Sequence, residues 1–151
     1  MSRLNIELFK KIRERIAAIP ESYDQEAWCR NNRAAPCGTS ACLAGEAIIC
    51  AAPTVEEGVK ELRHLDKHGS DYAIPERAAV LLGLEGNVEA YFEYNDEGDG
   101  GETIIFDGNA NKWPRQFKKQ FQSGDQAGAA VAYLDHIIET GKVLDWFEFK
   151  D

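Results

Sequence analysis

No apolar run in this 151-residue chain approaches the ~20 residues that a membrane-spanning helix needs. The N-terminus also lacks the continuous apolar segment and the small-residue cleavage site of a secretory signal. We therefore expect a cytoplasmic protein with no membrane partner, in which the four cysteines are reduced. The length suits a single domain, residues 1–151, whose core is large enough to fold without a disulfide or metal staple.

Basic residues are in the minority, with 17 Lys and Arg against 26 Asp and Glu and a formal net charge of −9. Direct binding to nucleic-acid phosphates requires a basic surface, so this composition argues against it. It favours a partner that itself has a basic surface. Residues 85–111 contain eight acids and neither Lys nor Arg, so the negative charge is concentrated there.

The sequence also lacks the residue spacings that are typical of common metal sites. The four cysteines, Cys29, Cys37, Cys42 and Cys50, are separated by seven, four and seven residues, without the C-x2-C knuckle of a zinc site. No register of residues 96–107 gives the EF-hand pattern with a glutamate at its twelfth position. We expect neither a metal nor another cofactor.

An N-terminal helix is indicated by Leu4, Leu8, Ile12 and Ile16, which recur every four residues before Pro20. Further helices are predicted where capping boxes or prolines begin a segment and glycines end it. These are a short turn after the Ser-x-x-Gln box of Ser22 and Gln25, a helix from Thr54 to Gly69, one from Pro75 to Gly83, a short one at Asn87, one after Trp113-Pro114 with Phe117 and Phe121, and a last one that stops at Gly141.

One short β-type run, residues 103–106, interrupts the helical pattern. Its sequence, Thr-Ile-Ile-Phe, has about the length of a strand and would pair with residues 91–94 or with its own neighbours in a small hairpin. The fold class predicted is therefore mainly α (α+β), a single-domain helical bundle with a small β-hairpin or short sheet.

The segment that organises the prediction is residues 37–50, C-G-T-S-A-C-L-A-G-E-A-I-I-C. Thr39 and Ser40 are suited to cap a helix that begins there and stops before Pro53. Backbone N–H groups at a helix start attract anions, so Gly38, Thr39 and Ser40 are candidates for binding a phosphate or carboxylate. The alternative is that they serve only as the N-cap.

Cys37 is a second candidate at this helix start. A nearby helix dipole lowers the pKa of a thiol and favours the thiolate nucleophile. A cysteine nucleophile also needs an adjacent base, most often a histidine. His64, His68 and His136 are all predicted in or at the end of helices. The enzyme question thus stays open, with an inert cysteine at a tight turn favoured over a catalytic one.

A partner surface is predicted from the acidic segment and its neighbouring aromatics. The acids would attract a basic surface, and the aromatic side chains would add apolar contacts. The residues concerned are Tyr91, Phe92, Tyr94, Asp96, Glu97, Asp99 and Glu102. The alternative is a solvated acidic loop.

Several pieces together resemble a family of small uncharacterised proteins from bacteria and their phages. The specific piece is C-G-T-x-x-C-x-A-G, here residues 37–45. The others are residues 20–25, Leu-Leu-Gly-Leu at 81–84, Trp113-Pro114, and residues 129–141 ending in I-I-E-T-G. Members often have an aromatic residue where this chain has Glu46 and lack much of residues 95–111. The resemblance implies a fold and a setting but no mechanism.

A shorter resemblance is local. Cys37-Gly38 followed by Ala41-Cys42-Leu43-Ala44 is similar to the nucleophile helix of papain-like and bacteriocin-processing cysteine peptidases.

The sequence therefore predicts a small acidic intracellular binding protein, a non-enzymatic inhibitor or accessory protein acting on a host or defence protein. One alternative is a binder of a nucleotide or other anionic small molecule at the central helix start. A second is a hydrolase that uses Cys37.

Overall fold

The computed structural model describes residues 4–27, 29–31, 38–70, 72–85, 101–108 and 110–143. Over these residues the chain is mainly helical with one short two-stranded antiparallel sheet, which confirms the predicted fold class. Its elements are α1 (Ile6–Ala18), η1 (Pro20–Ser22), β1 (Arg30–Asn31), β2 (Thr39–Ser40), α2 (Leu43–Ala51), α3 (Val55–His68), α4 (Ala73–Leu82), η3 (Gly101–Phe106), α5 (Arg115–Gln122) and α6 (Gln126–Thr140), where η is a 3-10 helix. None of the helices in these ranges is both long and apolar enough to cross a membrane.

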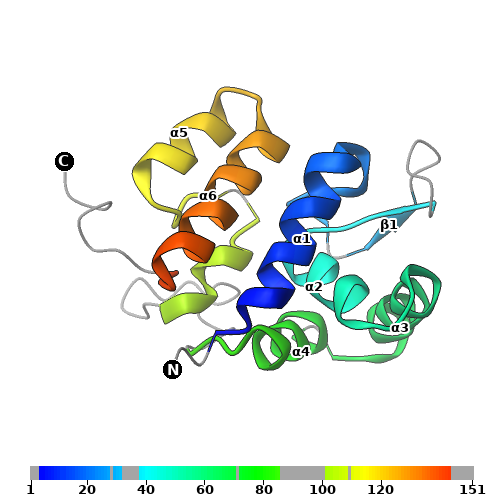
Figure 1. Ribbon diagram of the computed structural model, residues 1–151. Helices are drawn as coiled ribbons and strands as arrows, with labels where there is room; N and C mark the ends of the chain where they lie inside the picture. Colours follow the sequence, from blue (N-terminus) through cyan, green and yellow to red (C-terminus); the bar gives the residue numbers. More distant parts are fainter. Residues whose placement is uncertain are drawn as a thin grey trace.

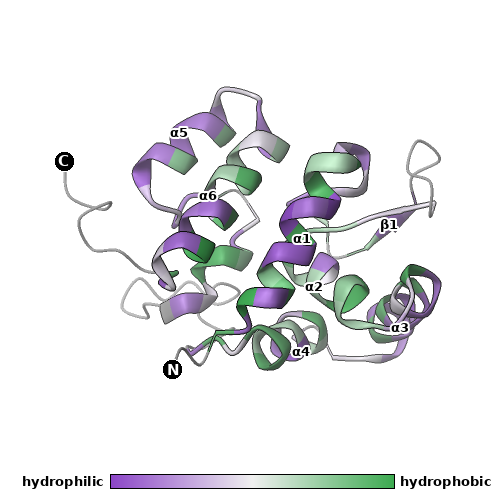
Figure 2. Ribbon diagram, in the orientation of Figure 1, coloured by the Kyte–Doolittle hydropathy of each residue, from purple (hydrophilic) through white to green (hydrophobic). Residues whose placement is uncertain are grey.

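Helix α2 lies at the centre of one half of the molecule, packed against α1, α3 and α4 (Figure 1). Every residue from Leu43 to Ile49 is buried, so this helix has no solvent face over two turns. Figure 2 accordingly shows α2 without a strongly hydrophilic side. Helices α5 and α6 pair with each other, and α6 packs along α1, which therefore joins the two halves.

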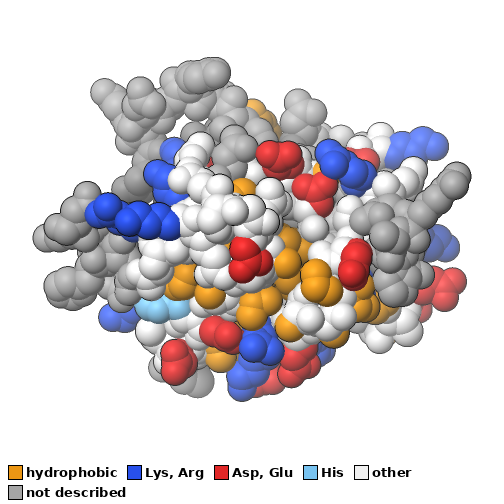
Figure 3. Space-filling model, turned by 90° about the horizontal axis from the view of Figure 1, so that it is seen from above, with side chains coloured by type: hydrophobic (Ala, Val, Ile, Leu, Met, Phe, Trp, Pro, Cys, Tyr) orange, Lys and Arg blue, Asp and Glu red, His pale blue; other side chains and the backbone are white. Residues whose placement is uncertain are grey.

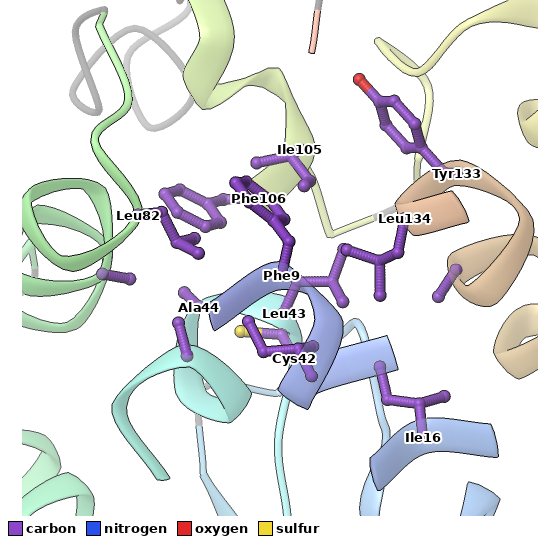
Figure 4. Close-up of a cluster of buried hydrophobic side chains, with 14 of the residues drawn as sticks. Phe9, Ile16, Cys42, Leu43, Ala44, Leu82, Ile105, Phe106, Tyr133 and Leu134 are labelled. Atoms are coloured by element: carbon purple, nitrogen blue, oxygen red, sulfur yellow. The ribbon is translucent and has the colours of Figure 1, made fainter. Parts of the chain in front are cut away.

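The core is built from side chains that converge from several elements (Figure 4). Phe9 of α1, Leu43 of α2, Leu82 of α4, Phe106 of η3 and Leu134 of α6 are all buried there. Burial of large apolar side chains contributes about 1.5–3 kcal/mol each before conformational entropy is counted. These contacts join segments from both ends of the chain in one core.

Local sequence explains most helix boundaries. Thr54 Oγ1 accepts a hydrogen bond from the Glu57 backbone N–H at 3.1 Å, as its capping box predicts. Gly83 and Gly141 follow α4 and α6 with φ angles of 75° and 69°, a left-handed conformation that favours glycine. Helix α4 begins at Ala73, two residues before the predicted Pro75.

The predicted strand at residues 103–106 is wrong. These residues lie in η3, and the Asp107 N–H bonds back to the Ile104 carbonyl. All four side chains are buried, whereas a strand with one solvated face buries alternate residues. The observed sheet instead pairs Arg30 with Ser40 and Asn31 with Thr39. The predicted partner strand at 91–94 and the short helix at Asn87 lie outside the described residues.

The predicted start of the central helix is also wrong. Thr39 and Ser40 form β2, and the chain remains extended until α2 begins at Leu43. The backbone partners of this stretch come from the segment after α1: the Ala41 N–H donates to the Ser22 carbonyl, and the Asp24 N–H donates to the Ala41 carbonyl. Sheet-type pairing therefore takes the place of helical hydrogen bonds before Cys42.

Candidate functional site

The N-terminus of α2 is filled by a side chain of the protein itself. Gln25 Oε1 accepts hydrogen bonds from the Leu43 N–H at 3.3 Å and from the Tyr23 hydroxyl at 2.8 Å. Its Nε2 donates to the Ile105 and Asp107 carbonyls at 3.1 and 2.9 Å. Gln25 is 2% exposed. The amide thus occupies the position that an anion would take at this helix start.

Gly38, Thr39 and Ser40, the predicted anion site, do not cap a helix. Thr39 and Ser40 are buried in β2, and Gly38 precedes them with a φ of 73°. The Arg63 guanidinium from α3 contacts the Thr39 hydroxyl and the Gly38 carbonyl at 2.5 and 3.4 Å. The anion site was predicted because these residues were expected to begin a helix, and they do not. Ligand binding there stays a prediction.

Cys42 and Cys50 are held in poor environments for a nucleophile. Burial raises the pKa of Cys42 and of Cys50 to about 12, so both remain protonated near neutral pH. Cys37 lies outside the described residues. His64 and His68 lie on α3 and His136 on α6, as predicted. In the part of the chain that the structure describes, no group of three or more His, Cys, Asp or Glu is arranged to hold a metal ion.

Glu46 is a buried carboxylate that sequence reasoning noted only as a departure from the resembled family. Its Oε2 accepts a hydrogen bond from Arg15 Nε at 2.7 Å, and the two side chains are 0% and 10% exposed. Burial raises the pKa of Glu46 to about 7, while Arg15 and the Ser22 hydroxyl lower it by less. The Glu46 carboxyl group therefore titrates near neutral pH.

Arg15 also lines a surface groove of about 480 Å³ between α1, the end of α2 and the start of α3. Its charged lining is mixed, with Lys11 and Arg15 against Glu14, and the remainder is mostly apolar. Glu46 is not among the lining residues, so a molecule in this groove would meet Arg15 and not the carboxylate. With two cations and one acid in its lining, this groove has a weaker positive character than a site lined by cations alone.

The predicted acidic partner surface falls mostly outside the described residues. Tyr91, Phe92, Tyr94, Asp96, Glu97 and Asp99 all lie there. Glu102 is described and is only 9% exposed, and its Oε1 accepts the Glu85 N–H at 2.8 Å. Glu102 stands near the start of η3, and its carboxylate binds the backbone N–H of Glu85, which follows α4; a role for Glu102 in partner binding stays a prediction.

A second groove, which we call the basic groove, lies between the turn at residues 111–113 and α5 and has a volume of about 420 Å³. Its lining consists of Asn111, Lys112, Trp113, Arg115, Lys118, Lys119 and Gln122. Four of these are cations, and no Asp or Glu is among the described residues that line it. Lys and Arg side chains project at the left of Figure 3, on the side where Figure 1 places α5.

The amphipathic pattern of α5 places these cations. Phe117 and Phe121 are buried: Phe117 stacks on Tyr133 with ring centroids 4.9 Å apart, and Phe121 meets the edge of Trp113 at 5.4 Å. Because both Phe residues face the core, Lys118 and Lys119 between them are directed away from it. Figure 2 shows α5 as a largely hydrophilic helix interrupted by hydrophobic positions.

The turn opposite α5 is fixed by hydrogen bonds. The Lys112 N–H donates to Asp107 Oδ2 at 2.9 Å, and Trp113 Nε1 donates to the Ile105 carbonyl at 3.3 Å. Gln122 Nε2 lies 3.5 Å from Asn111 Oδ1 and connects the end of α5 to the turn. Both walls of the basic groove are thus held by the fold. Ala110, just before the turn, has a φ of 57°, which is uncommon for a residue other than glycine.

Sequence reasoning missed the basic groove, although a pattern was present. Residues 112–119 contain four bases and no acid in a chain of net charge −9. The sequence prediction placed the binding surface on the acidic segment because that run of charge is longer. A local cluster of positive charge in a negatively charged protein is also a signal of a binding site, since it can attract ligands that the rest of the surface repels.

Comparisons with protein-family models, with curated proteins and with solved structures found no match for this chain.

Proposed function

We propose that the protein is a non-enzymatic cytoplasmic binding protein that holds an anionic ligand in the basic groove. The observation that carries the proposal is a groove with four cations and no acid among its described lining residues. Its volume of about 420 Å³ falls within the range of small-molecule sites. This proposal takes up anion binding, the alternative function predicted from the sequence, and moves it from the start of α2 to the start of α5.

The electrostatic cost of the groove supports the same function. Arg115 begins α5, where a cation opposes the positive end of the helix dipole. The N-cap is Pro114, which makes no side-chain capping bond, and the first turn contains no acid. The neighbouring Lys118 and Lys119 add repulsion between like charges. An anion bound at this helix start would interact favourably with the helix dipole and with Lys118 and Lys119.

A catalytic role for Cys42 or Cys50 is not favoured, because thiols with a pKa near 12 supply little thiolate. The resemblance to bacterial and phage proteins suggests that the binding protein is an accessory factor. A hydrolase that uses Cys37 stays a prediction that concerns residues outside the described ranges.

Thermal unfolding tests the proposal. Pyrophosphate, citrate and sulfate are compared with chloride at one ionic strength, so that general screening is equal. Anions that bind the folded state should raise the melting temperature with concentration, since ligands specific for the folded state stabilise it by mass action. Equal melting temperatures in all four salts would exclude anion binding in the millimolar range.

A second candidate is the inhibitor or accessory protein that binds a host or defence protein through the acidic segment. Its support is the run of eight acids without a base in residues 85–111. Replacing Asp96, Glu97 and Asp99 by the corresponding amides should weaken such a complex and reduce its salt dependence. Capture from native lysate on wild type and variant, with circular dichroism to check folding, measures this. Retention of the same protein by both would argue against the acidic segment as the binding surface.

A further inference from the structure

We propose that His64 and His68 of α3 together bind a divalent transition-metal ion of the kind that imidazole prefers. In Figure 1, α3 lies on the opposite side of the molecule from α5, so this metal site is separate from the basic groove and does not depend on anion binding. The proposal departs from the expectation of no metal, which was drawn from the spacing of cysteines and acids.

The two histidines lie one helical turn apart. Residues four apart in an α-helix project from the same side, so their side chains are neighbours. Both residues are exposed. Within the described part of the chain, neither has a hydrogen bond or an ion pair, and the contact between the two rings is the interaction that they make. Both imidazoles are therefore accessible to an ion from solution.

The distance between the two rings matches a shared ion. The ring centroids are 4.9 Å apart, and the ring planes are tilted by 46°. A metal–nitrogen bond of about 2.0–2.1 Å places the ion roughly 3.2 Å from the centroid of its imidazole. Two imidazoles on one ion, at a bond angle between about 90° and 109°, therefore have centroids roughly 4.5–5.2 Å apart. Rotation about χ2, which is broad for histidine, turns one nitrogen of each ring toward that ion.

The charge around the pair suits a cation. His68 is the last residue of α3, and the carbonyl end of a helix dipole attracts positive charge. Glu61 and Glu57 lie one and two turns before the pair on the same face of the helix. They offset the positive charge of Lys60 and Lys67, which are within one turn of the pair. A divalent ion at this position is therefore not repelled as it would be by a purely basic face.

Two imidazole ligands select the class of ion. Imidazole nitrogen suits zinc, copper and nickel, whereas Mg²⁺ and Ca²⁺ prefer oxygen ligands. Because the described residues contain no arrangement of three or more His, Cys, Asp or Glu around one ion, water completes the coordination. Closed sites with four protein ligands are typical of structural zinc, so an open site with two is one from which the ion exchanges.

Isothermal titration calorimetry of the protein without a polyhistidine tag tests the proposal with Ni²⁺, Co²⁺ and Mg²⁺ at neutral pH. We expect one Ni²⁺ per chain, weaker binding of Co²⁺ in agreement with the Irving–Williams order, and no detectable binding of Mg²⁺. The absorption spectrum of the Co²⁺ complex identifies the ligands, because thiolates give intense charge-transfer absorption in the near ultraviolet and imidazoles do not. We expect no such absorption.

Matched variants locate the site. His64→Gln and His68→Gln should each lower Ni²⁺ affinity by about tenfold or more, because one imidazole alone loses the gain from an intramolecular second ligand. The double variant should lose little beyond either single variant, since the two rings act as a unit. His136→Gln removes the third histidine of the chain, on α6, and should leave the affinity within about twofold. Circular dichroism checks that each variant is folded.

Loss of Ni²⁺ binding in both α3 variants, with His136→Gln unaffected, supports the site. The proposal is overturned if the wild type binds no Ni²⁺, if either α3 variant keeps the wild-type affinity, or if His136→Gln weakens binding as much as they do. Thiolate absorption in the Co²⁺ complex, or Mg²⁺ binding as tight as that of Ni²⁺, also overturns it, because cysteines or carboxylates would then hold the ion. Anion binding in the basic groove is tested with other ligands and stands or falls separately.

Discussion

Gly58 of α3 lies directly against the main chain of Ile49 in α2. A Cβ atom at position 58 would stand 2.6 Å from the Ile49 Cα, closer than side-chain carbons approach a backbone. Gly58 is buried, and α2 contributes small residues of its own, Ala44 and Gly45. The close approach of these two helices therefore depends on the absence of one side chain.

Gly58→Ala should lower the free energy of unfolding by about 1–3 kcal/mol through overpacking. The sign is informative, since alanine in an unconstrained helix would stabilise by about 1 kcal/mol relative to glycine. Urea unfolding measures the change, with Lys60→Ala on the exposed side of α3 as the control. A stabilised Gly58→Ala protein would mean that α2 and α3 are not in contact here.

Gln25→Leu should destabilise the fold by roughly 3 kcal/mol, because the buried Tyr23 hydroxyl and Leu43 N–H both lose their acceptor. Gln25→Glu should also destabilise, since a carboxylate cannot donate to the Ile105 carbonyl. Chemical denaturation of both is compared with Glu26→Gln, an exposed neighbour. Near-native stability of Gln25→Leu would contradict the hydrogen-bonded role of this amide.

Because of Glu46, the free energy of unfolding should fall as pH rises from about 4.5 to about 7. Its pKa is raised from 4.5 to about 7 in the folded state, so the folded protein holds more protons than the unfolded chain in this window. Relative to Glu46→Gln, the wild type should lose roughly 2–3 kcal/mol across the window. Denaturation at several pH values measures this, with Glu14→Gln as an exposed control. Parallel pH profiles of wild type and Glu46→Gln would show that Glu46 does not titrate there.

All four cysteines should be free thiols in the native protein, and Cys42 should resist alkylation until the protein unfolds. Cys42 is 0% exposed and its pKa is about 12, so both access and thiolate are lacking. Intact mass after iodoacetamide, with and without denaturant and without reductant, gives the count. A protected pair after denaturation would reveal a disulfide, and rapid modification of native Cys42 would place it at the surface.

The helical part of the fold was predictable because its information is local. The stripe of Leu8, Ile12 and Ile16, the Thr54 cap and the Gly141 stop each act within a few residues, and the structure confirms them. The strand predicted at 103–106 was wrong because a run of β-branched and aromatic residues indicates burial as well as strand. Contacts from Gln25, 80 residues away, hold that segment as a 3-10 helix.

The candidate site was less predictable for a similar reason. Thr39 and Ser40 match an N-cap in sequence, but pairing with Arg30 and Asn31 makes them a strand. The basic groove depends on the position of α5 relative to the 111–113 turn, which the packing of Trp113 and Phe121 determines. The sequence of residues 112–119 shows a cluster of cations. Only the tertiary contacts show that these side chains line a groove.

Amide chemical shifts of ¹⁵N-labelled protein during titration with pyrophosphate test anion binding in the basic groove most directly. Saturable shifts should concentrate on residues 111–122, and Lys118→Gln with Lys119→Gln should abolish them while the rest of the spectrum stays native. Shifts centred on residues 38–43 would return the ligand to the start of α2. No saturable shift anywhere would contradict anion binding by this protein.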